Sequence, residues 1–281
     1  MDLKPDFPRP LQAFLIIIAS FIFVFMATQV LVFIFVPDVE NLNQSSMAMK
    51  MLMSFGEVGL IIIPVIYIRN RNLSVRKAFR WNSIPLPIFF WSIIIGLSIT
   101  ILGDELDRLV NMIFPAPELL GQISEVFRIT SVPDFFLLVF GVVIAAAFVE
   151  ESIIRGFLQK SLEKYQDVTH AVIYASLAWT IIHGMIFWAI QIFLLGIVLG
   201  LLAWRSDSIF PSVIGHGINN AAALFFYNIN QDKLDKIYLW GDHVSPVFLI
   251  LAAAGLIYGV KAFYRYYPIL SEPVADYDSS S

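Results

Sequence analysis

Apolar runs long enough to cross a lipid bilayer constrain this chain more than any other feature. A membrane-spanning helix needs about 20 predominantly apolar residues. Over the whole chain 58% of the residues are hydrophobic and 14% are charged, whereas soluble domains have roughly 45–50% and about 25%. We therefore predict an all-α polytopic membrane protein with about eight transmembrane helices, in which residues 1–281 form a single membrane domain. The predicted spans are 11–36, 47–68, 84–103, 134–160, 168–188, 189–205, 208–226 and 246–266.

The boundaries of two spans need an argument from length. Residues 168–205 as one helix would be about 57 Å long at 1.5 Å per residue, nearly twice the hydrocarbon thickness of about 30 Å. We therefore expect two short helices with a tight turn near Trp188–Gln191. The run 11–36 exceeds the 7–15 residues of a signal-peptide core, and we see no small-residue cleavage site after it. We expect it to remain as the first transmembrane helix.

Basic residues indicate the orientation of these spans. With the N-terminus in the cytoplasm, 13 of the 18 Lys and Arg residues fall on the cytoplasmic side, as the positive-inside rule requires. The short loops and the absence of a targeting signal favour a prokaryotic plasma membrane. The other five basic residues fall outside: Lys50, Arg108, Arg128, Lys233 and Lys236.

Two segments are too polar to cross a membrane. In 104–133, one helical face carries Leu106, Leu109, Val110, Ile113 and Phe114. This part is expected to form an ordered external loop helix, with a helix lying in the membrane interface as the alternative. The polar tail 268–281 is expected to be disordered.

Composition also excludes several classes of function. The chain has no cysteine, which excludes disulfides, thiolate metal sites and a cysteine nucleophile. A net charge of -4 gives no basic surface for nucleic acid. The partners that we expect are the bilayer and a substrate held in it.

Ionisable residues inside the predicted spans are the candidates for function. Such residues are costly, at about 2.5–3.5 kcal/mol at the centre of a helix, and they mark functional sites by default. The set is small: Glu57, Glu150, Glu151, Arg155, His183 and His216, with Asn219 and Asn220 as uncharged polar companions.

Helical spacing separates the two adjacent acids. Glu151 and Arg155 are four residues apart and therefore share a helix face, where they can form an ion pair. Glu150 is rotated by about 100° from Glu151. We therefore expect Glu150 to point elsewhere and to meet His183 and His216 from other helices.

The other polar residues also come in pairs four residues apart, Trp179 with His183 and His216 with Asn220. A cavity between these helices would suit the activation of water. Glu150, desolvated there, would become a stronger base, and His183 would orient the water or shuttle its proton. His216 and Asn220 would donate hydrogen bonds to a developing oxyanion.

Structural roles compete with these assignments. Either histidine alone can bridge two helices, and Glu151 with Arg155 can be a purely structural pair. Glu57 has isoleucine at the i+4 position, and we interpret it as a carboxylate at a helix contact. Asn219 is interpreted in the same way, as a hydrogen bond between helices.

Three motifs in this order resemble those of the CAAX-prenyl-protease and bacteriocin-processing (CPBP, also called Abi) family of intramembrane endopeptidases. They are EESIIR at 150–155, WTIIH at 179–183 and HGINN at 216–220, within a motif-bearing core of 134–226. The family pattern is EExxxR, an aromatic residue with xxxH, and HxxxN, so Trp179 replaces the more common phenylalanine. The resemblance implies an intramembrane catalytic cavity enclosed by eight helices and cleavage of a membrane-associated peptide, prenylated in CAAX-type substrates. It also implies that Glu150 and His183 activate water, with His216 and Asn220 as the oxyanion site.

Metal dependence is a separate question, because this family has been called both metalloprotease and glutamate protease. Zinc would require Glu150, His183 and His216 as its three ligands. That set would consume Glu150, and Glu151 is held by Arg155, so no base would remain. We favour chemistry without a cofactor.

Two other functions fit an integral membrane protein of this kind. A proton-coupled transporter uses intramembrane Glu and His residues as a relay, but it needs a polar path through both halves of the chain. For such a path, the first three spans supply only Glu57 and Lys50, which lies at the polar end of its span. A non-cleaving immunity or scaffold protein would have the fold without turnover.

Overall fold

The computed structural model describes residues 7–35, 47–115, 117, 125–229 and 231–267, and these residues are almost entirely helical. The all-α prediction is therefore confirmed. The predicted tail 268–281 lies outside the described residues. The elements are α1 (Pro10–Phe35), α2 (Met47–Gly59), α3 (Ile62–Asn70), α4 (Val75–Ala78), α5 (Leu86–Ile113), η2 (Glu125–Phe127), α7 (Val132–Leu138), η3 (Val139–Ala145), α8 (Ala146–Glu151), η4 (Ser152–Leu158), α9 (Gln159–Glu163), α10 (Val168–His183), η5 (Ile186–Trp188), α11 (Ala189–Ser206), α12 (Phe210–Asn228), α13 (Gln231–Tyr238), β1 (Leu239–Trp240), β2 (His243–Val244) and α14 (Pro246–Tyr266).

Helices occupy all eight predicted spans. Within the described part of the chain, six helical segments are long and apolar enough to cross a membrane: Pro10–Ile34, Met47–Asn70, Leu86–Ile113, Val132–Glu163, Ile186–Ser206 and Pro246–Tyr266. The protein is therefore an integral, multi-pass membrane protein. Helix α10 is shorter, with 16 residues, or about 24 Å. Eight crossings remain a prediction, since α10 and α12 fall outside this group of six.

Two predicted boundaries are wrong. Helix α5 continues to Ile113, so the apolar face that begins at Leu106 belongs to this helix and not to a separate interfacial one. An ion pair between Asp104 and Arg108, 3.1 Å apart and one helical turn from each other, lies within this extension. The break between the fifth and sixth helices is real, but it falls at Gly184, before the expected turn at Trp188–Gln191. Gly184 has φ +65°, a left-handed conformation that glycine adopts without strain and that commonly ends a helix.

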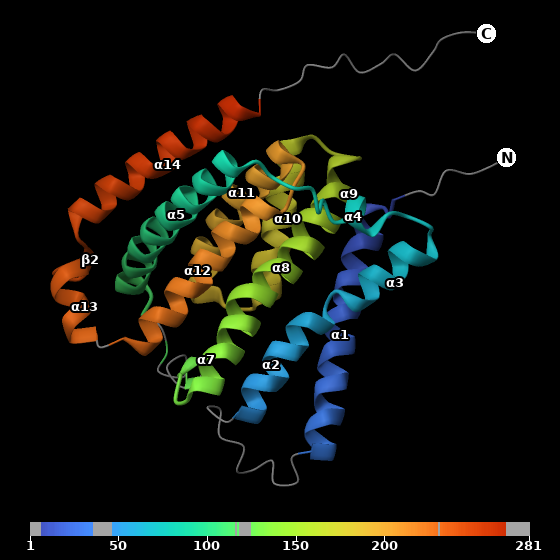
Figure 1. The fold of residues 1–281 in the computed structure, drawn as a ribbon, viewed down its shortest axis with the longest axis horizontal. Helices are drawn as coiled ribbons and strands as arrows, with labels where there is room; N and C mark the ends of the chain where they lie inside the picture. Colours follow the sequence, from blue (N-terminus) through green and yellow to red (C-terminus); the bar gives the residue numbers. More distant parts are fainter. Residues whose placement is uncertain (1–6, 36–46, 116, 118–124, 230, 268–281) are drawn as a thin grey trace.

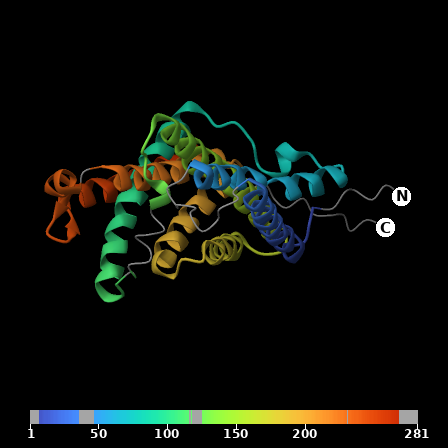
Figure 2. The same ribbon diagram turned by 90° about the horizontal axis from the view of Figure 1, so that it is seen from below.

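The helices form a row with a second layer against it. Figure 1 shows the row in the order α14, α5, α12, α8, α2 and α1. This spatial order differs from the order of the helices along the chain. Helices α10 and α11 pack together on one side of this row, as the view turned by 90° in Figure 2 shows. The candidate site lies where α2 and α10 meet the central segment, residues 132–163.

Small residues allow the central segment to pack closely. A Cβ atom added to Gly141 would lie 2.9 Å from the Cα atom of Ser54 in α2. Helices in a membrane approach through such residues because dispersion contacts drive their association. Ile153, Ile154 and Phe157, farther along the same segment, are almost completely buried in the core. The central segment is therefore fixed on both sides of its two acids.

Candidate active site

Residues 132–163 form one continuous helical segment with two irregular stretches. The stretches η3 and η4 are π-helical, and the α-helical turn α8 between them carries Glu150 and Glu151. π-Helical turns are rare and occur frequently at functional sites. Each one changes the angular spacing of the side chains that follow. The directions of the two acids are therefore set by this irregular backbone as well as by the 100° step between them.

Glu151 belongs to a fully buried ionic cluster. Its Oε1 atom lies 2.8 Å from Arg155 Nη1 and 3.0 Å from His216 Nδ1. The side chains of Glu151 and Arg155 are 0% exposed. The ion pair expected from the i,i+4 spacing is therefore present. A carboxylate only accepts hydrogen bonds, so both Arg155 and His216 are donors to it.

Glu150 points in a different direction, as expected, and meets a different set of partners. Its Oε2 atom accepts a hydrogen bond of 2.6 Å from the Trp179 indole N–H. The same oxygen is 3.8 Å from His183 Nε2. The His183 Nδ1 atom lies 2.8 Å from the Trp179 carbonyl oxygen. Because a carbonyl only accepts, Nδ1 carries a proton and, in the neutral ring, Nε2 carries the lone pair.

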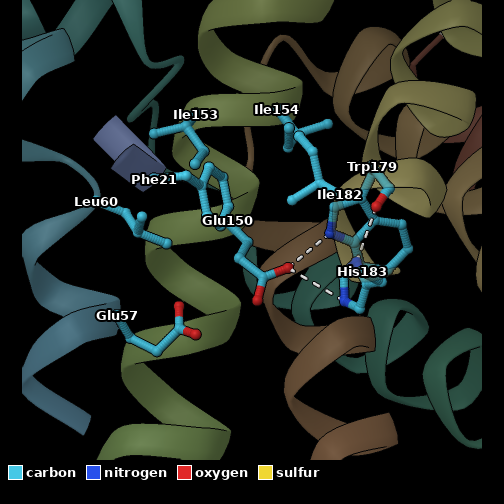
Figure 3. A pocket seen from close by; sticks show the side chains of 9 residues that line it. All are labelled: Phe21, Glu57, Leu60, Glu150, Ile153, Ile154, Trp179, Ile182 and His183. Atoms are coloured by element: carbon cyan, nitrogen blue, oxygen red, sulfur yellow. Dashed lines mark hydrogen bonds and ion pairs between the residues drawn. The ribbon is translucent and has the colours of Figure 1, made fainter. Parts of the chain in front are cut away.

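The Glu150 carboxyl faces a small cavity, shown in Figure 3. Its volume is about 160 Å³. Apolar side chains form much of its wall, so a charge inside it is only partly solvated. The Glu150 side chain is 14% exposed and that of His183 29% exposed. The lining residues are Phe21, Glu57, Leu60, Glu150, Ile153, Ile154, Trp179, Ile182 and His183.

The structure does not bring His216 and Asn220 to this cavity. His216 binds Glu151, not Glu150, which corrects the expected meeting of Glu150 with His216. The Asn220 amide donates to the carbonyl oxygen of Val142, at 2.9 Å. The residue spacing correctly predicted that Glu150 and Glu151 point in different directions. It could not show which of the two acids His216 of α12 would contact.

Two residues of the site were underestimated from the sequence. Glu57 lines the same cavity as Glu150, although it was interpreted as a helix-contact carboxylate. Trp179 supplies an N–H group that the more common phenylalanine lacks, and its ring packs against His183, His216 and Arg155. The only signal for Glu57 in the sequence was its unusual place in an apolar run.

The residues expected to hold zinc are not grouped together in the described part of the chain. Among the described residues, no three or more His, Asp and Glu side chains are grouped closely enough to hold one. The set expected for zinc was Glu150, His183 and His216, and His216 Nδ1 is instead bonded to Glu151. No step of the proposed chemistry is therefore assigned to a metal.

The fold and the site define an integral membrane protein whose helices bring carboxyl and imidazole groups to one cavity. Residues 132–222 match the family model described as type II CAAX prenyl endopeptidase Rce1-like. The match covers about a third of the chain and includes all three motifs. It confirms the resemblance to the CAAX-protease (CPBP) family, which is a family of proteases. The comparisons with curated proteins and with solved structures gave no match.

Proposed function

We propose that this protein is an intramembrane endopeptidase in which Glu150 activates a water molecule. The observation that carries the proposal is the position of Glu150 Oε2, hydrogen-bonded to Trp179 and 3.8 Å from His183 Nε2 at the wall of the cavity. That separation is too long for a direct hydrogen bond and suits a bridging water. A water there would contact a carboxylate base and an imidazole lone pair at once.

The chemistry follows from these contacts. Glu150 removes a proton from the water as its oxygen attacks the carbonyl carbon of the scissile bond. His183 holds the water through Nε2, and its ring is fixed by the Nδ1–H bond to Trp179. The Trp179 N–H bond fixes the Glu150 carboxyl at the wall of the cavity, with Oε2 toward His183.

The motifs imply that His216 and Asn220 bind the oxyanion, but in the structure both side chains have other partners. In the described arrangement His216 supports Glu151 and Asn220 is bonded to Val142. A role in binding the oxyanion requires Asn220 to exchange its bond to Val142 for one to the substrate. It also requires His216, whose Nδ1 donates to Glu151, to donate through a protonated Nε2. We assign the oxyanion site to these two residues on that condition.

The substrate that we propose is a membrane-associated peptide or protein of the CAAX type, presented with its prenyl group in the bilayer. The proposal rests on the family match over the catalytic segment and on the apolar wall of the cavity. We further propose that the host membrane is a prokaryotic plasma membrane, which the short loops favour. The distribution of basic residues supports a cytoplasmic N-terminus.

The test uses the purified full-length protein and a peptide library, prenylated and unprenylated, with products read by mass spectrometry. We expect the wild type to cleave prenylated members and Glu150→Ala and His183→Ala to lose cleavage by at least about 100-fold, the usual contribution of general-base catalysis. Each variant is checked for insertion and monodispersity. Peptide cleavage at the wild-type rate by either variant would contradict the proposal. In a parallel sample, activity abolished by exhaustive chelation and restored only by zinc would overturn the metal-free assignment.

A further inference from the structure

A second carboxyl group shares the cavity with Glu150. Glu57 projects from α2 on the opposite side, and Figure 3 shows the two carboxyl groups pointing toward one another across the cavity. The Glu57 Oε2 atom is buried and has no hydrogen-bond partner among the described residues. Because buried polar groups are normally paired, this oxygen is available to bond to a group that enters the cavity.

The two acids have unequal surroundings. Glu150 receives the Trp179 N–H and lies beside His183, whereas Glu57 Oε2 has no donor and Leu60 lies on the same wall. Two carboxylates in one poorly solvated site are not readily ionised together, because each repels the other. The N–H donor stabilises the negative charge on Glu150. A proton held by this pair is therefore favoured on Glu57, the acid without a donor.

We propose that Glu57 is the general acid of this site, a second catalytic residue that protonates the leaving nitrogen. The inference rests on the proposed function, since it assigns a step of the same hydrolysis. The amine half of a peptide bond is too basic to leave as an RNH⁻ anion. A proton must therefore reach the peptide nitrogen as the C–N bond breaks. Glu57 is the second acid of the cavity and faces the base that takes the other proton.

The protons and bonds balance as follows. Glu150 takes one proton from the water, and the new C–O bond forms as the carbonyl becomes an oxyanion. The C=O bond then re-forms, the C–N bond breaks, and the Glu57 proton moves to the nitrogen. The products are a carboxylic acid and an amine, with Glu150 protonated and Glu57 ionised. Transfer of the proton from Glu150 to Glu57 restores the starting state, and no oxidant or other reactant is consumed.

The experiment compares two substrates of the same sequence that differ only at the scissile bond, one a peptide and the other a thioester. A thiolate leaves without being protonated, so the thioester needs the base but not the acid. We expect Glu57→Gln to lower kcat on the peptide by about 100-fold and to change the thioester rate by less than about threefold. Glu150→Gln should lose both activities, after subtraction of the enzyme-free rate.

Each other outcome has a definite meaning. Equal losses on both substrates in Glu57→Gln, or no loss on either, would overturn the acid role. Activity on both substrates in Glu150→Gln would defeat the proposed function itself, independently of Glu57. If Glu57→Gln does not fold, Glu57→Asp and Glu57→Asn form a pair of nearly equal size. The aspartate should then retain peptide cleavage that the asparagine lacks, and equal peptide rates would contradict the proposal.

Discussion

Trp179 is the side chain through which the two polar clusters of the site touch. Its indole N–H binds Glu150, and its ring centroid lies 5.2 Å from that of His216. The Arg155 guanidinium carbon is 4.3 Å from the centre of the same ring, a cation–π contact. One buried aromatic residue therefore orients the base and covers the ion pair that supports the neighbouring acid.

Loss of the indole N–H should slow catalysis without weakening substrate binding. Trp179→Phe keeps an aromatic ring but leaves Glu150 Oε2 without its donor. A hydrogen bond to a charged group contributes about 1.5–3 kcal/mol, so we expect kcat to fall about tenfold or more with KM nearly unchanged. Steady-state kinetics with a prenylated peptide measure this.

Two controls separate the N–H from the shape of the side chain. Replacement of Trp179 by 3-benzothienylalanine, in which sulfur takes the place of the N–H, should reproduce the loss. Trp204→Phe, in α11 beside Arg205, should leave kcat unchanged. A benzothienyl variant with wild-type kcat would show that the ring alone is sufficient.

The sequence predicted contacts within one helix better than contacts between helices. The pair Glu151–Arg155 follows from the i,i+4 spacing, because both ends lie on one helix face. The contact of His216 with Glu151 depends on how the central segment is rotated relative to α12, which residue spacing does not contain. The approach of Glu57 to Glu150 depends on the packing of α2 against the central segment. These are long-range properties of the assembled bundle.

At the scale of elements, the position of α2 against the central segment decides where Glu57 lies. The contact is made where Ser54 of α2 faces Gly141 of η3. The Ser54 hydroxyl donates to the Leu137 carbonyl, at 3.2 Å, so the two helices also share a hydrogen bond. The eight helical segments were predictable from hydropathy, but the π-helical stretches were not, because no composition rule marks where an extra residue enters a turn.

A methyl group at Gly141 should push α2 away. Its Cβ would lie 2.5 Å from Ser54 Cβ and 2.9 Å from Ser54 Cα, both closer than side chains normally approach. We expect Gly141→Ala to lower the free energy of unfolding by about 1–3 kcal/mol, as overpacking usually does, and to reduce peptide cleavage through the displacement of Glu57. Thermal unfolding in detergent, followed by tryptophan fluorescence, provides the measurement.

The matched substitution is Gly217→Ala, whose Cβ would meet its nearest neighbour, the Val143 carbonyl oxygen, at 3.4 Å. It should be nearly neutral. The double variant Gly141→Ala with Ser54→Gly should recover part of the lost stability, because it removes the Ser54 side chain from the contact. Additive losses in the double variant would contradict this explanation of the contact.

At the scale of the whole molecule, polar contacts gather loops at the two ends of the bundle. At one end Arg80 binds Glu163, with Nη1 3.0 Å from Oε1, and Asp207, with Nε 3.0 Å from Oδ1. These residues belong to three connections that the charge distribution assigns to the cytoplasm. At the other end Lys50 binds Asp134 at 2.7 Å. These contacts are consistent with helices that cross the membrane in alternating directions. Because Arg80 contacts both Glu163, before α10, and Asp207, after α11, the chain enters α10 and leaves α11 on the same side.

The absence of cysteine makes this topology directly testable, because an introduced cysteine is the only thiol in the chain. The exposed residues Gln166, before α10, and Asp242, between β1 and β2, are predicted to lie on opposite sides. We expect a membrane-impermeant maleimide to label Gln166→Cys only in inverted vesicles and Asp242→Cys only in right-side-out vesicles, with detergent-solubilised samples as the control for reactivity. The reverse pattern would place the N-terminus outside.

Ile186→Cys, in the connection between α10 and α11, should be labelled from the same side as Asp242→Cys, since the positive-inside arrangement has both helices crossing. Labelling from the side of Gln166→Cys would show that these two helices do not cross, and the number of spans would fall from eight to six.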